Sequence, residues 1–211
     1  MIEIIIVASL SYLCGSIPFG LLLTKIFAGK DIRKVGSGNI GATNVLRGGN
    51  KFLATLTLLL DVTKGYFPVI ITMNYYPELI QLSCLLCFLG HIFPIWLKFK
   101  GGKGVATYLG ILFALSIQLG LLFIFTWLVV SLIFKYSSVS SMFATLTVFV
   151  IHTIREIAEP IFKRMSDDTS RTHDIDFSLS LLLFIFLILV IFTHKKNISN
   201  LKNKTEHKIR I

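Results

Sequence analysis

Long apolar segments are the feature that most limits how this chain can fold. They alternate with polar or glycine-rich stretches and cover residues 2–27, 52–73, 79–97, 105–134, 139–152 and 177–193. A helix needs about 20 apolar residues to cross the hydrocarbon core of a bilayer. The chain is 54% hydrophobic and only 15% charged, whereas soluble domains carry about 25% charged residues. The pattern predicts an all-α integral membrane protein.

The segment 105–134 decides how many spans we expect. One continuous helix of that length would measure about 45 Å, well beyond the roughly 30 Å core. The polar interruption at 116–120 therefore indicates two short helices. With two, basic residues gather on one side of the membrane, as the positive-inside rule requires. We expect about seven transmembrane helices, with the N-terminus external and the C-terminus cytoplasmic.

This topology predicts a single polytopic membrane domain over residues 1–211. Its polar loops face the cytoplasm, and they cover 28–51, 98–104, 135–141 and 194–208. The segment 153–176 is expected to be an external loop, and its basic residues violate the rule locally. The first apolar stretch lacks the positive start of a signal peptide, so we expect a retained helix there. The cysteines Cys14, Cys84 and Cys87 lie in apolar stretches and are interpreted as core residues, with no metal site.

The first cytoplasmic loop combines glycines with hydrogen-bonding residues. It contains a G-x-G-x-x-G pattern at Gly36, Gly38 and Gly41, but no strand or βαβ unit surrounds it, so a dinucleotide site is rejected. Glycines let backbone N–H groups form an anion-binding nest. An arginine adds a planar fork that matches phosphate. The polar candidates in this loop are Ser37, Asn39, Thr43, Asn44 and Arg47.

The second loop reads Gly101-Gly102-Lys103-Gly104 directly before an apolar segment. It departs from the P-loop pattern, because a glycine follows the lysine where serine or threonine is needed. Backbone amides, a helix N-terminus and a lysine still favour an anion. The alternative is a basic turn that only obeys topology.

Two further places carry polar residues within or beside apolar segments. Asp61 and Lys64 are spaced to pair on one helix, although ionisable residues in a span also mark substrate contacts. The sequence is compatible with both interpretations. The run 136–141 contains serines that either cap a helix or serve the site.

Together these segments resemble the bacterial acyl-phosphate:glycerol-3-phosphate acyltransferase (PlsY) family. The resemblance rests on residues 37–44 followed by Arg47, on Leu60 to Gly65, on Gly90-His91 with Pro94, Phe99 and 101–104, on 136–141, and on a looser tail motif with His194, Asn197, Ile198, Leu201 and Thr205-Glu206. The tail departs from the family, which usually has arginine at the position of Asn200 and glycine at that of Lys204.

The resemblance implies an enzyme that moves a fatty acyl group from acyl phosphate to the 1-hydroxyl of sn-glycerol 3-phosphate. The products are lysophosphatidic acid and inorganic phosphate, in phospholipid biosynthesis. It also implies a site on the cytoplasmic side of the bacterial plasma membrane, with no metal or CoA requirement. We therefore expect no cofactor. Acyl-CoA-dependent acyltransferases of other families use an H-x-x-x-x-D motif, which this sequence lacks.

The resemblance also assigns roles to residues. The expected catalytic residues are Ser37, Arg47, Lys103, Ser138, His194 and Asn197. The expected substrate-binding residues are Gly38, Asn39, Gly41, Thr43, Asn44, Gly101, Gly102, Gly104 and Glu206. Arg47 and Lys103 would stabilise charge that develops on phosphate and carbonyl oxygens. His194 is the first candidate base, and a substrate phosphate oxygen is its rival.

The expected partners are the two phosphate-bearing substrates and membrane lipids, and not nucleic acid. A functional coupling to the enzyme that forms the acyl phosphate is left open. Most of the formal charge of +10 is assigned to topology and to contact with anionic lipid. The alternatives are a transporter for an organic phosphate, which should show inverted repeats, and a structural membrane protein.

Overall fold

The described part of the chain consists of helices joined by turns and loops. The computed structural model describes the backbone of residues 1–165 and 178–209, with side chains for 1–159 and 178–209. No strand occurs in these two ranges, which agrees with the all-α prediction. The α-helices are α1 (Ile2–Ser16), α2 (Phe19–Ala28), α3 (Ala42–Arg47), α4 (Lys51–Tyr75), α5 (Ile80–Ile92), α6 (Val105–Leu115), α7 (Ile117–Phe134), α8 (Ser137–Met165), α9 (Ser178–Thr193) and α10 (Lys195–Lys202). Short 3-10 turns are η1 (Ile32–Lys34), η2 (Pro77–Leu79) and η3 (Ile95–Leu97).

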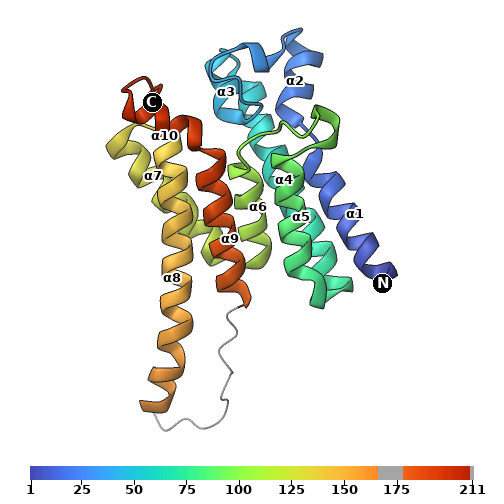
Figure 1. The fold of residues 1–211 in the computed structure, drawn as a ribbon, viewed down its shortest axis with the longest axis vertical. Helices are drawn as coiled ribbons and strands as arrows, with labels where there is room; N and C mark the ends of the chain where they lie inside the picture. The colour runs from blue at the N-terminus through green and yellow to red at the C-terminus, as the bar shows by residue number, and fades with distance from the viewer. Residues whose placement is uncertain (166–177, 210–211) are drawn as a thin grey trace. The chain divides into compact units, whose positions relative to one another are not determined.

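The helices form two compact units, Met1–Leu121 and Leu122–Ile211, with the boundary inside α7. In the first unit α1 packs along α5, and α4 packs along α6 (Figure 1). In the second unit α8 packs along α9. That residues 1–211 form one domain stays a prediction.

Four helical stretches among the described residues are long and apolar enough to cross a membrane. They are Lys51–Tyr75, Pro77–Leu97, Ile117–Phe134 and Ser137–Glu159. The bent pairs α1 with α2 and α9 with α10 raise the number to six. A seventh span would need α6, whose 11 residues extend only about 16 Å. The count of seven and the orientation of the termini stay predictions.

Helix breaks lie within the apolar segments 2–27 and 105–134, and only the second was expected. The predicted interruption of 105–134 is confirmed, since Ser116 is extended (φ −164°, ψ 128°) between α6 and α7. The segment 2–27 was expected to be one helix, and this is wrong. It bends by 41° between α1 and α2 because Pro18 disfavours helical geometry at Ile17, which is extended with ψ 117°.

The expected loop at 153–176 is also wrong in its first part. Helix α8 continues to Met165, and the rest of that segment lies outside the described residues. The sequence over 153–159 is charged, but Arg155, Glu156, Ala158 and Glu159 are good helix formers. Charged residues are tolerated in a helix that extends beyond the hydrocarbon core. The polar composition of 153–159 therefore did not mark the end of α8.

Close backbone contact joins α4 and α6 in the first unit. A side chain on Gly65 would meet the backbone oxygen of Thr107, and one on Gly110 would meet that of Val62. Small residues at such contacts let membrane helices approach closely. The start of α6, which follows Lys103, is thereby held against α4.

The first two predicted loops lie at the same end of the first unit. Ile32, Ile40 and Val45 from the first loop form a buried cluster with residues of α2 and α4. Leu97, the last residue of η3 directly before the second loop, packs against it. Hydrophobic burial thus brings together two segments that are separated in sequence by α4 and α5.

The other two predicted loops lie together in the second unit. The Ile209 N–H donates to the Lys135 carbonyl oxygen at 2.7 Å, which joins the tail to the linker between α7 and α8. Helix α10 occupies most of the expected tail loop and bends away from α9 by 55°.

Candidate active site

The buried amide of Asn44 shapes the first loop. Its Oδ1 accepts from the Ser37 N–H (2.9 Å) and hydroxyl (3.1 Å). Its Nδ2 lies within hydrogen-bonding distance of the carbonyl oxygens of Asn39 (2.7 Å), Val35 (2.9 Å) and Ile32 (3.1 Å). Asn44 is 2% exposed, so its amide serves the loop itself. Its contact with substrate stays a prediction.

The glycines of this loop make the turn possible. Gly36 and Gly38 have φ values of 55° and 75°, in the left-handed region that other residues avoid. The N–H of Gly38 donates to Val35 O, and the N–H of Ile40 donates to Asn39 Oδ1. Several of the expected nest amides are thus engaged within the loop, so the polar side chains become the stronger candidates for ligand contact.

Helix α3 places Thr43 and Arg47 on one face, because residues four apart share a face. Asn44 and Val45 lie on its buried side. Arg47 is half-buried and Thr43 exposed. The first loop therefore carries an arginine and a hydroxyl on one face of α3, while Asn44 on the buried side is held by its hydrogen bonds.

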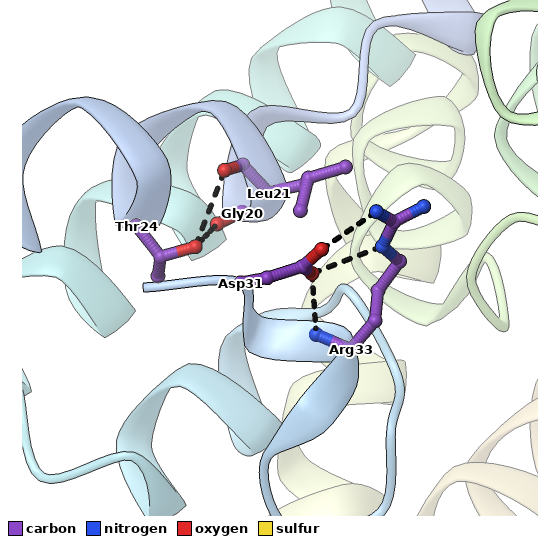
Figure 2. Close-up of polar contacts among 5 residues, drawn as sticks. All are labelled: Gly20, Leu21, Thr24, Asp31 and Arg33. Atoms are coloured by element: carbon purple, nitrogen blue, oxygen red, sulfur yellow. Dashed lines mark hydrogen bonds and ion pairs between the residues drawn. The ribbon is translucent and has the colours of Figure 1, made fainter. Parts of the chain in front are cut away.

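An ion pair closes the turn in the first part of this loop, before its glycines (Figure 2). Asp31 Oδ1 accepts from the Arg33 N–H (3.0 Å) and Nε (2.9 Å), and Oδ2 accepts from a terminal guanidinium nitrogen (2.6 Å). The hydrogen-bonded Arg33 guanidinium holds the pKa of the Asp31 carboxyl well below its usual range. Sequence reasoning missed this pair, although the D-x-R spacing before a glycine turn was a usable signal.

The second loop folds back onto the end of α5. The N–H groups of Gly101 and Gly102 donate to the carbonyl oxygens of Ile92 (2.9 Å) and His91 (3.1 Å). These two amides were expected to face an anion, and the structure instead uses them to close the turn. Contact between these glycines and substrate stays a prediction. Lys103 is half-buried and precedes Gly104, the N-cap of α6, where the helix dipole adds to its positive potential.

Asp61 and Lys64 form an ion pair inside the first unit. Lys64 Nζ lies 2.7 Å from Asp61 Oδ1, and both side chains are 3% exposed. The ammonium also donates to Ile17 O at 2.6 Å, at the bend between α1 and α2. The pairing interpretation is confirmed by this geometry, and the burial of both groups argues against direct substrate contact.

The Glu206 carboxylate contacts three polar residues of the second unit. Its Oε1 accepts from Ser138 Oγ (3.0 Å) and Asn197 Nδ2 (2.7 Å), and its Oε2 lies 3.4 Å from Asn200 Nδ2. Three residues that the sequence assigned to the site are therefore brought together. Asn200, which stands where the resemblance expects arginine, joins them through the same carboxylate.

His194 lies at the bend between α9 and α10 and is 1% exposed. Its Nδ1 is 2.8 Å from Val190 O. Because a carbonyl oxygen only accepts, this contact places the proton on Nδ1, so Nε2 of the neutral ring carries the lone pair. That tautomer suits a general base acting through Nε2.

Two groups of expected residues result, one in each unit. The first unit brings Ser37, Asn39 and Asn44 into one loop beside Arg47, and holds Lys103 at the start of α6. The second unit joins Ser138, Asn197 and Glu206, with His194 at the N-terminus of α10. Beyond Asp31 and Arg33, sequence reasoning also missed Thr107, whose hydroxyl lies 3.0 Å from His91 Nδ1.

Comparisons with known proteins agree with these motifs. The family model described as glycerol-3-phosphate acyltransferase matches residues 5–204. A glycerol-3-phosphate acyltransferase from Pelagibacter ubique is 51% identical over 209 residues, which cover 99% of each chain. One from Mesorhizobium japonicum is 45% identical over 198 residues, covering 94% of this chain and 92% of the relative.

Solved structures show the same fold. The crystal structure of PlsY (YgiH), an integral membrane glycerol 3-phosphate acyltransferase, in its glycerol 3-phosphate form has a TM-score of 0.83 and 32% identity, covering 98% of this chain and 96% of that one. Its lysophosphatidic acid form has a TM-score of 0.80 at 32% identity, covering 97% and 94%. The family match, the identities and the shared membrane fold lead to one conclusion: this chain belongs to the glycerol-3-phosphate acyltransferase family.

Proposed function

We propose that this protein transfers a fatty acyl group from acyl phosphate to the 1-hydroxyl of sn-glycerol 3-phosphate, in phospholipid biosynthesis. The observation that carries the proposal is the likeness, over nearly the whole chain, to an acyltransferase solved in a glycerol 3-phosphate form and a lysophosphatidic acid form. Those two molecules are the acceptor and the product of such a reaction.

Acyl transfer from acyl phosphate needs little catalysis beyond the positioning of the two substrates. The acceptor hydroxyl oxygen attacks the acyl carbonyl carbon, the bond from that carbon to the phosphate oxygen breaks, and phosphate leaves with the electron pair. The hydroxyl proton passes to His194 Nε2 or directly to a phosphate oxygen, and the released phosphate takes it up. A mixed anhydride already has a good leaving group, so binding both substrates in the right geometry supplies most of the acceleration.

The roles of the residues follow from their charge and place. Arg47 and Lys103 hold phosphate oxygens and stabilise the charge that develops there, with Ser37, Thr43 and Asn39 as hydrogen-bonding neighbours. Gly38, Gly41, Gly101, Gly102 and Gly104 give the loops their shape. Ser138, Asn197 and His194 orient the acceptor, and Glu206 holds the first two in place.

We place the site on the cytoplasmic side of the bacterial plasma membrane, in a chain with seven spans, an external N-terminus and a cytoplasmic C-terminus. In support, the two loops of the first unit share one end, as do the linker and tail of the second. All four carry basic residues, which favours the cytoplasmic side. Coupling to the enzyme that makes the acyl phosphate fits a donor that hydrolyses readily.

The donor is tested with purified protein and glycerol 3-phosphate. A long-chain acyl phosphate should give lysophosphatidic acid, and the matching acyl-CoA should give none. Lys103→Gln should lower turnover, whereas Lys100→Gln, an exposed lysine on the same loop, should leave it unchanged. Product from acyl-CoA alone would reject the proposed donor.

A further inference from the structure

His91 contacts residues on both sides of Lys103, one in the second loop and one in α6. Its carbonyl oxygen accepts the Gly102 N–H at 3.1 Å, one residue before the lysine. Its Nδ1 lies 3.0 Å from the hydroxyl of Thr107, four residues after the lysine. One residue on α5 thereby fixes both the backbone that leads to Lys103 and the first turn of the helix that follows it.

The imidazole also fills the space beneath the loop. A Cβ added at Gly102 would meet Nε2, Cδ2 and Cε1 of the His91 ring, so the buried glycine rests directly on it. A smaller side chain at position 91 would leave a cavity under the residue that precedes Lys103. Segments beside such a cavity relax only in part and lose a unique position.

His91 is itself backed by the buried ion pair. Its Nδ1 lies 4.0 Å from Asp61 Oδ1, the oxygen that pairs with Lys64 at 2.7 Å. Lys64 in turn donates to Ile17 O, at the bend between α1 and α2. The network therefore joins α4, α5, α6 and that bend around one imidazole.

The members of this network are buried. Over the whole residue, backbone included, Asp61 is 2% exposed, Lys64 5%, His91 4% and Thr107 0%. A substrate phosphate held by Lys103 therefore does not need to touch them. We propose that His91, backed by the Asp61–Lys64 ion pair, is the positioning residue that fixes Lys103 for its substrate phosphate.

This inference rests on the proposed function, which gives Lys103 a phosphate to bind. It is tested by a double-mutant cycle in purified full-length protein, with kcat and KM measured for each substrate in His91→Ala, Lys103→Gln and the double variant. His91→Ala should raise KM for the same substrate as Lys103→Gln does, with about a tenfold loss in kcat/KM, because small misplacements of a binding group are costly. In the Lys103→Gln background, His91→Ala should lower kcat/KM by less than about twofold, because the effects of substitutions at coupled residues are not additive.

A matched control separates positioning from general destabilisation. Ser83 is fully buried on the same helix and pairs with Ser11 at 2.8 Å, away from the loop. Ser83→Ala should lower the thermal midpoint without changing either KM. If His91→Ala does not fold, Thr107→Val removes only the hydroxyl at similar volume and should give the same KM change in smaller measure.

Two outcomes would overturn the inference. One is an unchanged KM in both His91→Ala and Thr107→Val. The other is a loss of kcat/KM on His91→Ala that is equally large with Lys103 present and with Lys103→Gln. Failure of the proposed function looks different, because the wild type would then form no lysophosphatidic acid from acyl phosphate. Wild-type activity together with an additive cycle would reject only the positioning role.

Discussion

The hydroxyl of Ser138 donates a 3.0 Å hydrogen bond to Glu206, a residue 68 positions further along the chain. The same carboxylate oxygen accepts from Asn197 at 2.7 Å. A carboxylate only accepts hydrogen bonds, so it fixes which way the hydroxyl and the amide point. The tail thus sets the orientation of two residues that we assign to the acceptor hydroxyl.

Glu206→Gln should therefore lower activity although it keeps the shape of the side chain. The new amide nitrogen would face donors, and hydrogen bonds to a charged group contribute about 1.5–3 kcal/mol each. We expect kcat/KM to fall about tenfold to a hundredfold. Glu78→Gln, an exposed glutamate in η2, is the matched control. Equal activity of both variants would remove Glu206 from the site.

Asn44→Asp should destabilise the first loop strongly. The substitution replaces an NH₂ donor by an oxygen that faces three carbonyl oxygens in a buried place. The free energy of unfolding should fall by about 3 kcal/mol or more. Asn50→Asp serves as the control, because Asn50 caps α4 through Oδ1 and aspartate caps equally well. Thermal midpoints in detergent compare the two, and similar values would contradict the shaping role.

The Asp31–Arg33 pair should stabilise the chain at neutral pH and lose that effect in acid. The pKa of Asp31 is lowered in the folded protein, so its contribution is complete above the unfolded pKa of about 3.9. It declines as pH falls through the folded value. The thermal midpoint difference between wild type and Asp31→Asn should be small, because the pair is exposed, and constant from about pH 8 to pH 5. A difference that grows in acid would contradict this assignment.

Lys204→Gly should stabilise the tail. Lys204 has φ 59°, and the N–H groups of Lys204 and Thr205 donate to Leu201 O and Asn200 O at the end of α10. This is the Schellman arrangement, which favours glycine. Removing a left-handed strain of about 1–2 kcal/mol, less the entropy cost of glycine, should raise stability by about 0.5–1 kcal/mol. Lys202→Gly, within the helix, should lower it, and the same sign for both would refute the explanation.

Short-range sequence patterns predicted those features of the structure that neighbouring residues determine. The break at Ser116 and the pairing of Asp61 with Lys64 follow from polarity and from helical spacing, and both are present. The bend at Pro18 was missed because the apolar run continues through it. The extension of α8 past residue 153 was missed because charged helix formers resemble a loop in composition.

Contacts between distant segments were beyond such patterns. No periodicity reports that Leu97 packs against the first loop, or that Glu206 meets Ser138. The amides of Gly101 and Gly102 look available in the sequence because their partners, the last carbonyls of α5, become visible only when the chain folds back. The motif resemblance assigned Ser138, Asn197 and Glu206 to the site, whereas the hydrogen bonds between them are seen only in the structure.

The most direct test of the account follows the phosphorus atoms of one reaction. Purified protein is mixed with acyl phosphate and glycerol 3-phosphate and monitored by ³¹P NMR. Acyl phosphate should disappear while lysophosphatidic acid and inorganic phosphate appear one to one, with Lys103→Gln slowed and Lys100→Gln unchanged. Release of phosphate without lysophosphatidic acid, or no reaction while the protein in vesicles takes up glycerol 3-phosphate, would contradict the acyltransferase account.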